Sequence, residues 1–210
     1  MAIIDTITLD VADTESAARF YADAFDLDER RLRLRAADEP SSGFRGFTLA
    51  LTVSRPADVD SFVASAVAAG ATVLKPAAKS LWGYGGVVQA PDGTIWKLAT
   101  SAKKDSGPAT RQVDEFVLLI GVADFAATKR FYVEQGLAVT KSFGRVYAEF
   151  DAAGGPVKLA LYRRKALAKD LGVDPEGSGS HRLVVNSSSV PACTDLDGFR
   201  WAAGAAAAAA

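Results

Sequence analysis

The stretch that decides the fold is Val11-Ala12-Asp13 followed, with five residues between, by Arg19-Phe20-Tyr21. It occurs a second time as Val122-Ala123-Asp124 and Arg130-Phe131-Tyr132, at a constant offset of 111 positions (13 to 124). A signature repeated at a fixed distance indicates that one supersecondary plan is built twice. The chain of 210 residues therefore predicts two related halves rather than one large domain.

A second pair of motifs closes the two halves. Pro91-Asp92-Gly93-Thr94-Ile95-Trp96 ends the first copy and Asp197-Gly198-Phe199-Arg200-Trp201 ends the second. The two tryptophans stand at equivalent places, which favours a shared role in core packing. The expected division is a first domain over 1–100, a linker over 101–112, an abbreviated second domain over 113–203 and an alanine-rich tail over 204–210.

Local patterns predict the elements within each half. Ile7, Leu9 and Val11 alternate with polar residues, which is typical of a strand with one apolar face, and Asp13 is placed to cap a helix over 14–25. Further helices are expected from Pro56, Asp124 and Arg164, with strands between them. The run from Val117 to Ile120 contains no polar residue, so this strand is expected to be buried on both faces.

Composition limits the partners and the compartment. Lys and Arg number 24 against 25 Asp and Glu, so the chain has no basic excess and neither nucleic acid nor membrane is predicted as a partner. A single cysteine, Cys193, excludes an intramolecular disulfide and is typical of a reducing compartment. With no signal-peptide pattern and no apolar run of membrane length, a cytoplasmic location is expected.

An opening strand, a helix that starts V-A-D and carries R-F-Y, and a closing hairpin with P-D-G-x-x-W resemble the vicinal oxygen chelate superfamily. That group includes glyoxalase I, extradiol dioxygenases and the fosfomycin- and bleomycin-resistance proteins. The resemblance implies an α+β fold of two tandem glyoxalase-like domains built from paired βαβββ modules. Mixed, curved sheets would surround a concave cavity with helices outside, and the second domain would be abbreviated.

The same resemblance implies where a metal would be held. In glyoxalase I the first ligand lies seven residues before the Asp that starts the helix, a place taken here by Thr6 and Val117. The last ligand lies four residues after the Gly of the closing motif, where this chain has Lys97 and Ala202. A protonated lysine and an alanine offer no electron pair to a metal.

The remaining ligand positions lie on middle strands. The histidine position matches Thr48 in the first copy and His181 in the second, and the other glutamate position matches Leu159. Because His181 is the one histidine of the chain, a two-histidine, one-carboxylate iron site within one subunit is impossible. Neither a metal nor a cofactor is therefore predicted; metal held between subunits or by atypical oxygen donors stays open.

Polar residues of the opening strand are the first ligand-binding candidates. Thr6, Thr8 and Asp10 alternate with its apolar face, so they are expected to face the cavity, where they either bind a ligand or are solvated. On the neighbouring strand Arg33 lies between two further arginines. Together with Lys97 it would form an anion-recognising wall, and the alternative is a charged, solvated strand edge.

Three other residues complete the candidate set. Trp82 and Tyr84 stand in a glycine-rich approach to a strand, where their rings could stack on a flat ligand or cap the core. His181 is the best single candidate for a general base or a substrate hydrogen bond, against a structural role.

Three functions follow. The first is metal-independent binding or sequestration of a small amphipathic or anionic molecule by a glyoxalase/bleomycin-resistance-like protein. The second is a glyoxalase-like lyase or isomerase with a displaced metal site or acid/base chemistry at His181. The third is a non-catalytic interaction module. The expected partner is a small-molecule ligand, and a homodimer is the oligomer that the resemblance suggests.

Overall fold

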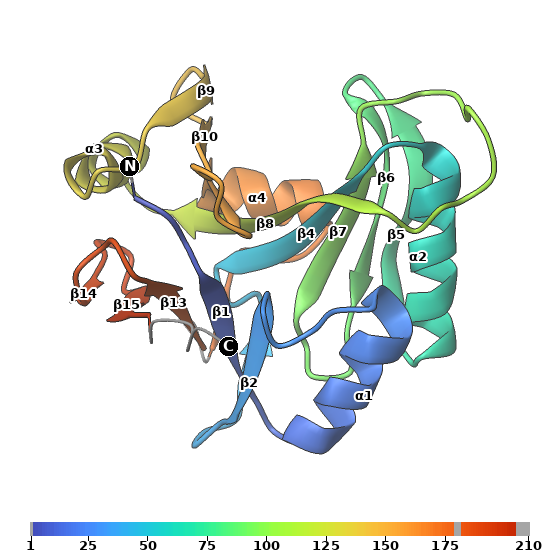
Figure 1. Cartoon of the computed structure of the whole chain (residues 1–210), viewed down its shortest axis with the longest axis horizontal. Coiled ribbons are helices and arrows are strands. Elements are labelled where there is room, and N and C mark those ends of the chain that lie inside the picture. The colour runs from blue at the N-terminus through green and yellow to red at the C-terminus, as the bar shows by residue number, and fades with distance from the viewer. Residues whose placement is uncertain (1, 179–181, 205–210) are drawn as a thin grey trace.

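Strands and helices alternate along the first half of the chain in the places that the sequence patterns predict (Figure 1). The computed structural model describes residues 2–178 and 182–204. The elements of this half are β1 (Thr6–Val11), α1 (Thr14–Phe25), β2 (Leu32–Ala36), β3 (Ser42–Gly43), β4 (Phe47–Val53), α2 (Pro56–Ala68), β5 (Thr72–Ser80), β6 (Gly83–Gln89) and β7 (Ile95–Thr100).

The second half repeats this order and then shortens. Its elements are β8 (Val113–Val122), α3 (Phe125–Glu134), β9 (Val139–Phe143), β10 (Tyr147–Phe150), β11 (Lys158–Arg163), α4 (Arg164–Leu171), β12 (Gly177–Ser178), β13 (Leu183–Ser187), β14 (Cys193–Thr194) and β15 (Arg200–Ala203). Residues 188–192, between β13 and β14, form no helix, which accords with the predicted abbreviation. No helix of the described residues is long and apolar enough to cross a membrane.

Two mixed sheets carry the fold, which confirms the α+β class. The larger has eight strands in the order β5-β6-β7-β4-β8-β11-β10-β9, and the smaller has five in the order β14-β15-β13-β1-β2. Each sheet joins strands from both halves, because β4 pairs with β8 and β1 pairs with β13, both antiparallel. The division of the chain into two domains stays a prediction.

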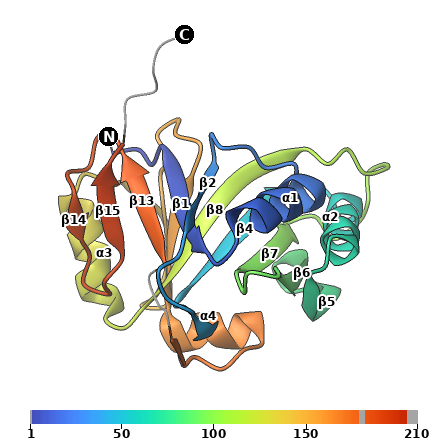
Figure 2. The same cartoon turned by 90° about the horizontal axis from the view of Figure 1, so that it is seen from below.

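The eight-stranded sheet consists of two complete βαβββ modules. In one module β4 and β7 are parallel neighbours, and in the other β8 and β11 are, with α2 and α3 as the crossover helices. The five-stranded sheet holds the reduced modules, β1 with β2 and β13 with β15. Figure 2 shows both sheets from below, with the five-stranded one beside α3.

The repeated sequence motifs perform the same structural tasks twice. The carboxylate of Asp13 accepts backbone N–H bonds at the start of α1, and that of Asp124 does so at the start of α3. The hydroxyl of Tyr21 donates to Asp92 (2.6 Å), while the hydroxyl of Tyr132 donates to Asp195 (2.5 Å). Helix and closing turn are thereby locked together in both halves.

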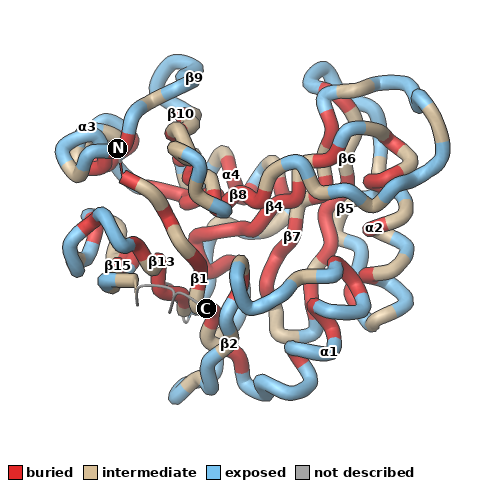
Figure 3. The backbone as a smooth tube through the Cα atoms, in the orientation of Figure 1, coloured by how far each residue is buried: buried red, intermediate tan, exposed pale blue. Residues whose placement is uncertain are grey.

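The closing tryptophans pack beside these tyrosines, as the sequence predicts. The ring centroids of Tyr21 and Trp96 are 5.4 Å apart and those of Tyr132 and Trp201 are 5.5 Å apart. Both tryptophans are buried in one large apolar core. Figure 3 shows buried backbone along β1, β4, β7 and β8, where that core lies.

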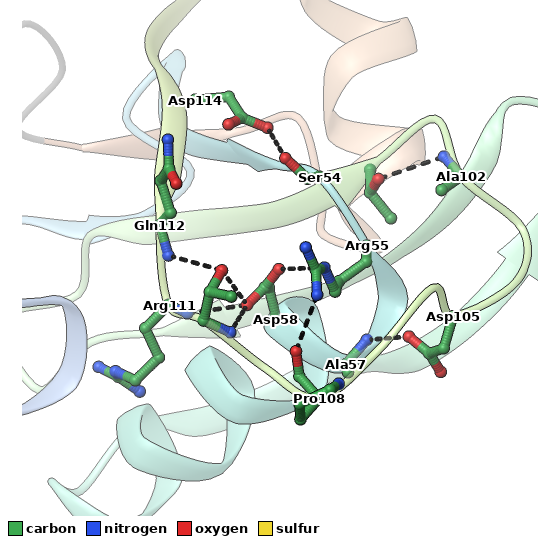
Figure 4. Close-up of polar contacts among 12 residues, drawn as sticks. Ser54, Arg55, Ala57, Asp58, Ala102, Asp105, Pro108, Arg111, Gln112 and Asp114 are labelled. Atoms are coloured by element: carbon green, nitrogen blue, oxygen red, sulfur yellow. Dashed lines mark hydrogen bonds and ion pairs between the residues drawn. The ribbon is translucent and has the colours of Figure 1, made fainter.

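The segment predicted as a linker is fastened to α2 (Figure 4). The carboxylate of Asp105 accepts a hydrogen bond from the backbone N–H of Ala57 (2.6 Å), in the first turn of the helix. The guanidinium of Arg55 donates to the carbonyl of Pro108 (3.0 Å). The segment therefore makes specific polar contacts, which its linker-like composition did not indicate.

Asp58 is the centre of this attachment. Its carboxylate is fully buried and accepts hydrogen bonds from the backbone N–H groups of Thr110 (2.6 Å) and Arg111 (2.8 Å). The Arg111 guanidinium continues inward, donating to Ser65 Oγ (2.7 Å) and to the carbonyl of Ala24 at the end of α1 (3.1 Å). The end of the linker thus joins both helices to the start of β8.

Candidate functional site

The eight-stranded sheet curls until its two edges approach one another. In a flat sheet β5 and β9, the edge strands, would be roughly 30 Å apart. Yet the ring of Trp82, in the β5–β6 turn, has its centroid 5.7 Å from the ring of Phe143 on β9. We call the face of the sheet on which these rings meet the concave face.

One helix packs on the concave face. α1, α2 and α3 contribute to the large core outside the sheet, whereas α4 packs on the opposite side with Leu167, Ala168 and Leu171 (Figure 2). These side chains contact the inner residues of β4 and β8, among them Ala50 and Val117. Part of the cavity expected from the sequence is thus filled by the chain itself.

Two lysine–carboxylate pairs lie on this face beside α4. Lys97 of β7 pairs with Asp170 at the end of α4, and Lys158 of β11 pairs with Glu115 of β8. Lys97, Ala50, Val117 and Lys158 form one cross-strand row through β7, β4, β8 and β11. All four charged side chains are between 20% and 41% exposed, so solvent reaches them.

An aromatic row leads from the rim to these charges. We use this term for Trp82, Phe143, Tyr147 and Tyr162. Phe143 stacks on Tyr147 with centroids 6.1 Å apart, and Tyr147 meets Tyr162 edge to face at 5.1 Å. Trp82 is 74% exposed and Phe143 is 45% exposed, so the outer end of the row is accessible.

The tyrosines of the row are held in their neutral form. Burial, followed by the hydrogen bond to Glu149, raises the pKa of Tyr147 far above its usual value. Burial and the charge of Asp170 raise the pKa of Tyr162. Neither phenol is set up as a general base, and both present neutral ring faces and hydroxyl groups.

A pocket of about 540 Å³ borders this face at the start of α4. Its lining combines cationic residues such as Arg163 and Lys165 with apolar ones such as Val146 and Pro175, and it includes the acidic Glu176. Val146 and Arg163 directly flank the row in the sequence, and the N–H of Arg163 donates to the carbonyl of Val146 (2.9 Å). The volume is within the range typical of small-molecule sites.

Comparison with known proteins identifies the fold family. Residues 6–99 match the family described as Glyoxalase-like domain. Glyoxalase I from Zea mays superposes on 96% of this chain and 91% of its own, with 13% identity and a TM-score of 0.64. The first half of the chain thus carries a glyoxalase-like domain, and the whole chain has the fold of glyoxalase I.

A second solved structure extends the likeness. A candidate dioxygenase from Bacillus subtilis matches 93% of this chain and 71% of its own, with 12% identity and a TM-score of 0.54. At these identities the likeness concerns the fold. No curated protein gives a significant sequence match.

The metal-ligand positions that the resemblance to glyoxalase I implies fall into two groups, one in each sheet. Val117 and Lys97 lie in one cross-strand row of the eight-stranded sheet. Thr6 and Ala202 lie in one row of the five-stranded sheet, joined through Asn186. Each prospective site therefore combines a position of the first repeat with one of the second.

The residues at these positions do not fit a divalent cation. Lys97 forms an ion pair with Asp170, and the side chains of Val117 and Ala202 have no atom that could coordinate a metal. The hydroxyl of Thr48 donates to the Ile95 carbonyl (2.7 Å). Among the residues described, no group of three His, Cys, Asp or Glu could hold a metal.

Two further positions from the resemblance bear on the same question. The side chain of Leu159 is buried in the large outer core, so this position does not face the concave side at all. His181 lies outside the described residues, and so does any acid/base role assigned to it.

The candidates on β1 and β2 lie together, on the five-stranded sheet. Thr6 is buried and donates to the Arg31 carbonyl (3.1 Å), and Thr8 accepts from Asn186 (2.9 Å). Asp10 pairs with Arg35 (2.8 Å), whereas Arg33 is exposed. Thr6, Thr8 and Asp10 are thus engaged within the protein, and their role in binding a ligand stays a prediction.

Lys97, Trp82 and Tyr84 lie apart from that group. Lys97 is in the eight-stranded sheet, so the expected wall of arginines and Lys97 is not formed. Trp82 joins the aromatic row, but Tyr84 turns toward α2 and donates to Asp60 (2.8 Å). Gly83 between them has φ of +140°, and a Cβ there would lie 2.0 Å from the Thr100 carbonyl oxygen.

The sequence analysis did not single out most of the concave face. It missed Phe143, Tyr147 and Tyr162 of the aromatic row, and the charged residues Glu115, Lys158 and Asp170. Alternation along β11, where Lys158 and Tyr162 share a face, was an available signal. The position of α4, which supplies Asp170, has no such signal in the local pattern.

Proposed function

We propose that this glyoxalase-like protein binds a small amphipathic molecule on the concave face of the eight-stranded sheet, without a metal. The observation that carries the proposal is the accessible aromatic row beside two lysine–carboxylate pairs, one of which contains Lys97, at a position where the resemblance to glyoxalase I implies a metal ligand. A flat apolar part of the ligand would stack on Trp82 and Phe143. An anionic group would replace Asp170 or Glu115 at a lysine.

The ion pairs explain how such a site can select its ligand. Lys97 and Lys158 are satisfied by carboxylates in the free protein, so an incoming anion must compete with them. Because the pairs are partly solvent-exposed, each stabilises the free state by only about 0 to 1 kcal/mol, and exchange costs little. The neutral hydroxyl of Tyr162 adds a hydrogen-bond donor between the charged and aromatic parts, while that of Tyr147 is donated to Glu149.

The test uses anilinonaphthalene sulfonate, a fluorescent aromatic anion, on the full chain after treatment with a chelator. We expect saturable one-to-one binding that addition of divalent metal leaves unchanged. Trp82→Ala and Phe143→Ala should each weaken binding about tenfold, since each removes one stacking surface. Leu81→Ala is the matched control, because Leu81 is 78% exposed in the same turn, and its dissociation constant should stay within about twofold.

Equal weakening by all three variants would show only nonspecific adsorption and would refute the site. Binding that requires added metal would instead favour a lyase or isomerase with a displaced metal site. Failure to bind this probe and a panel of aromatic acids would favour the interaction module, for which the packing of α4 on the concave face is the supporting observation.

A further inference from the structure

A second cluster of charge lies away from the aromatic row, centred on Arg45. This residue stands between β3 and β4 and is only 4% exposed. Its Nη2 donates to Thr94 Oγ1 (2.6 Å) and its guanidinium carbon is 5.2 Å from the ring centroid of Phe47. Its Nη1 is buried and has no hydrogen-bond acceptor among the described residues.

Arg182 repeats this situation. It immediately precedes β13, and its Nη1 donates to Ser41 Oγ (2.6 Å), in the same β2–β4 connection that carries Arg45. Its Nη2 is buried and likewise lacks an acceptor within the described ranges. Neither guanidinium forms an ion pair with a described carboxylate.

The neighbouring acids are already engaged. Asp10 stands opposite Arg182 on β1, and its carboxylate accepts two bonds from Arg35 (both 2.8 Å). Asp92 accepts from the Tyr21 hydroxyl (2.6 Å) and from the Thr94 N–H (2.8 Å). Neither carboxylate therefore forms an ion pair with Arg45 or Arg182.

The two unpaired guanidinium groups act on each other. Burial lowers the pKa of Arg45, the charge of Asp92 opposes this, and the charge of Arg182 lowers the pKa further. Arginine does not release its proton in proteins, so this repulsion cannot be relieved by neutralisation. A buried charge without a partner destabilises the folded state, and an anion in contact with both nitrogens would offset this cost.

We propose that Arg45 and Arg182 together bind a small oxyanion, the phosphate or carboxylate group of a metabolite, through the two nitrogens that lack acceptors. Arg45 lies two residues before β4 of the eight-stranded sheet and Arg182 immediately precedes β13 of the five-stranded sheet, so the site combines residues that adjoin both sheets. None of the residues of the aromatic row takes part in it. Guanidinium groups match the geometry of both oxyanions.

The experiment measures the thermal midpoint of the full chain against inorganic phosphate, sulfate and acetate, with sodium chloride at matched ionic strength as reference. A saturable rise is expected with at least one oxyanion, because a ligand of the folded state stabilises it. The three salts separate a phosphate-like from a carboxylate preference. Calorimetric titration with the best anion then gives the dissociation constant.

Variants locate the site. Arg182→Gln should weaken anion binding at least about tenfold, as should Arg45→Met. Arg33→Gln, an exposed arginine of the five-stranded sheet, and Trp82→Ala should change it by less than about twofold. Should Arg45→Met fail to fold, Arg182→Gln decides alone. No oxyanion effect beyond chloride, or unaltered binding by Arg182→Gln, would overturn the proposal.

Discussion

Asp58→Ala is expected to lower the free energy of unfolding by about 3 to 5 kcal/mol, the usual cost of breaking a buried charged network. The substitution removes the acceptor of the Thr110 and Arg111 N–H groups. It also removes the carboxylate that pairs with Arg55, whose Nε is 3.5 Å from it. Because Asp58 is fully buried, water cannot easily replace it. Urea unfolding followed by circular dichroism measures the loss.

Two companion variants make this result specific. Asp105→Ala removes an exposed carboxylate that also binds the α2 region, and should cost only about 1 kcal/mol. Asp58→Asn keeps an acceptor oxygen and should fall between the two. If Asp58→Ala cost no more than Asp105→Ala, the attachment of the linker to α2 would contribute little to stability.

Stability is expected to fall steeply above about pH 10, the usual pKa of tyrosine. Burial, then the charge of Asp92, raises the pKa of Tyr21 well above that value in the folded protein, and burial with Asp195 does the same for Tyr132. Only the unfolded chain can then release these protons, so the stabilisation is complete below about pH 10 and is lost as the pH rises. Each tyrosine contributes about 1.4 kcal/mol per pH unit.

The measurement is urea unfolding at a series of alkaline pH values, for the wild type and Tyr132→Phe. The variant should show a slope smaller by about 1.4 kcal/mol per pH unit, since phenylalanine does not ionise. Tyr84→Phe is the comparison: the hydrogen bond to Asp60 raises the pKa of Tyr84 too, but less far than burial raises that of Tyr132, so its effect on the slope should end at a lower pH. Identical slopes for wild type and Tyr132→Phe would show that Tyr132 ionises without unfolding.

Local sequence patterns predicted the elements well and their assembly poorly. Alternation placed β1 correctly, and the unbroken apolar run of β8 proved to be buried on both faces, with Leu118 in the outer core and Val117 under α4. No local pattern could show that β1 pairs with β13, because the partners Thr6 and Asn186 are far apart in sequence. The pairing of distant strands depends on which modules share a sheet, and the sequence repeat is compatible with more than one such arrangement.

The candidate site shows the same limit. Trp82 and Tyr84 are two residues apart and were expected to share a role, but Trp82 lies in a turn that reaches Phe143 while Tyr84 faces α2. Arg33 and Lys97 were expected to face one ligand, and they lie in different sheets. The sequence indicated which types of residue could bind a ligand. Which of them lie close together depends on the curl of the eight-stranded sheet and on the position of α4.

The central claim is that the concave face works without a metal. Its most direct test is the metal content of the full-length protein, purified without chelator and measured by inductively coupled plasma mass spectrometry. We expect far less than one equivalent of any divalent transition metal per chain, because Lys97, Val117 and Thr48 stand at the donor positions. One equivalent that survives purification and is removed by a chelator would contradict the claim.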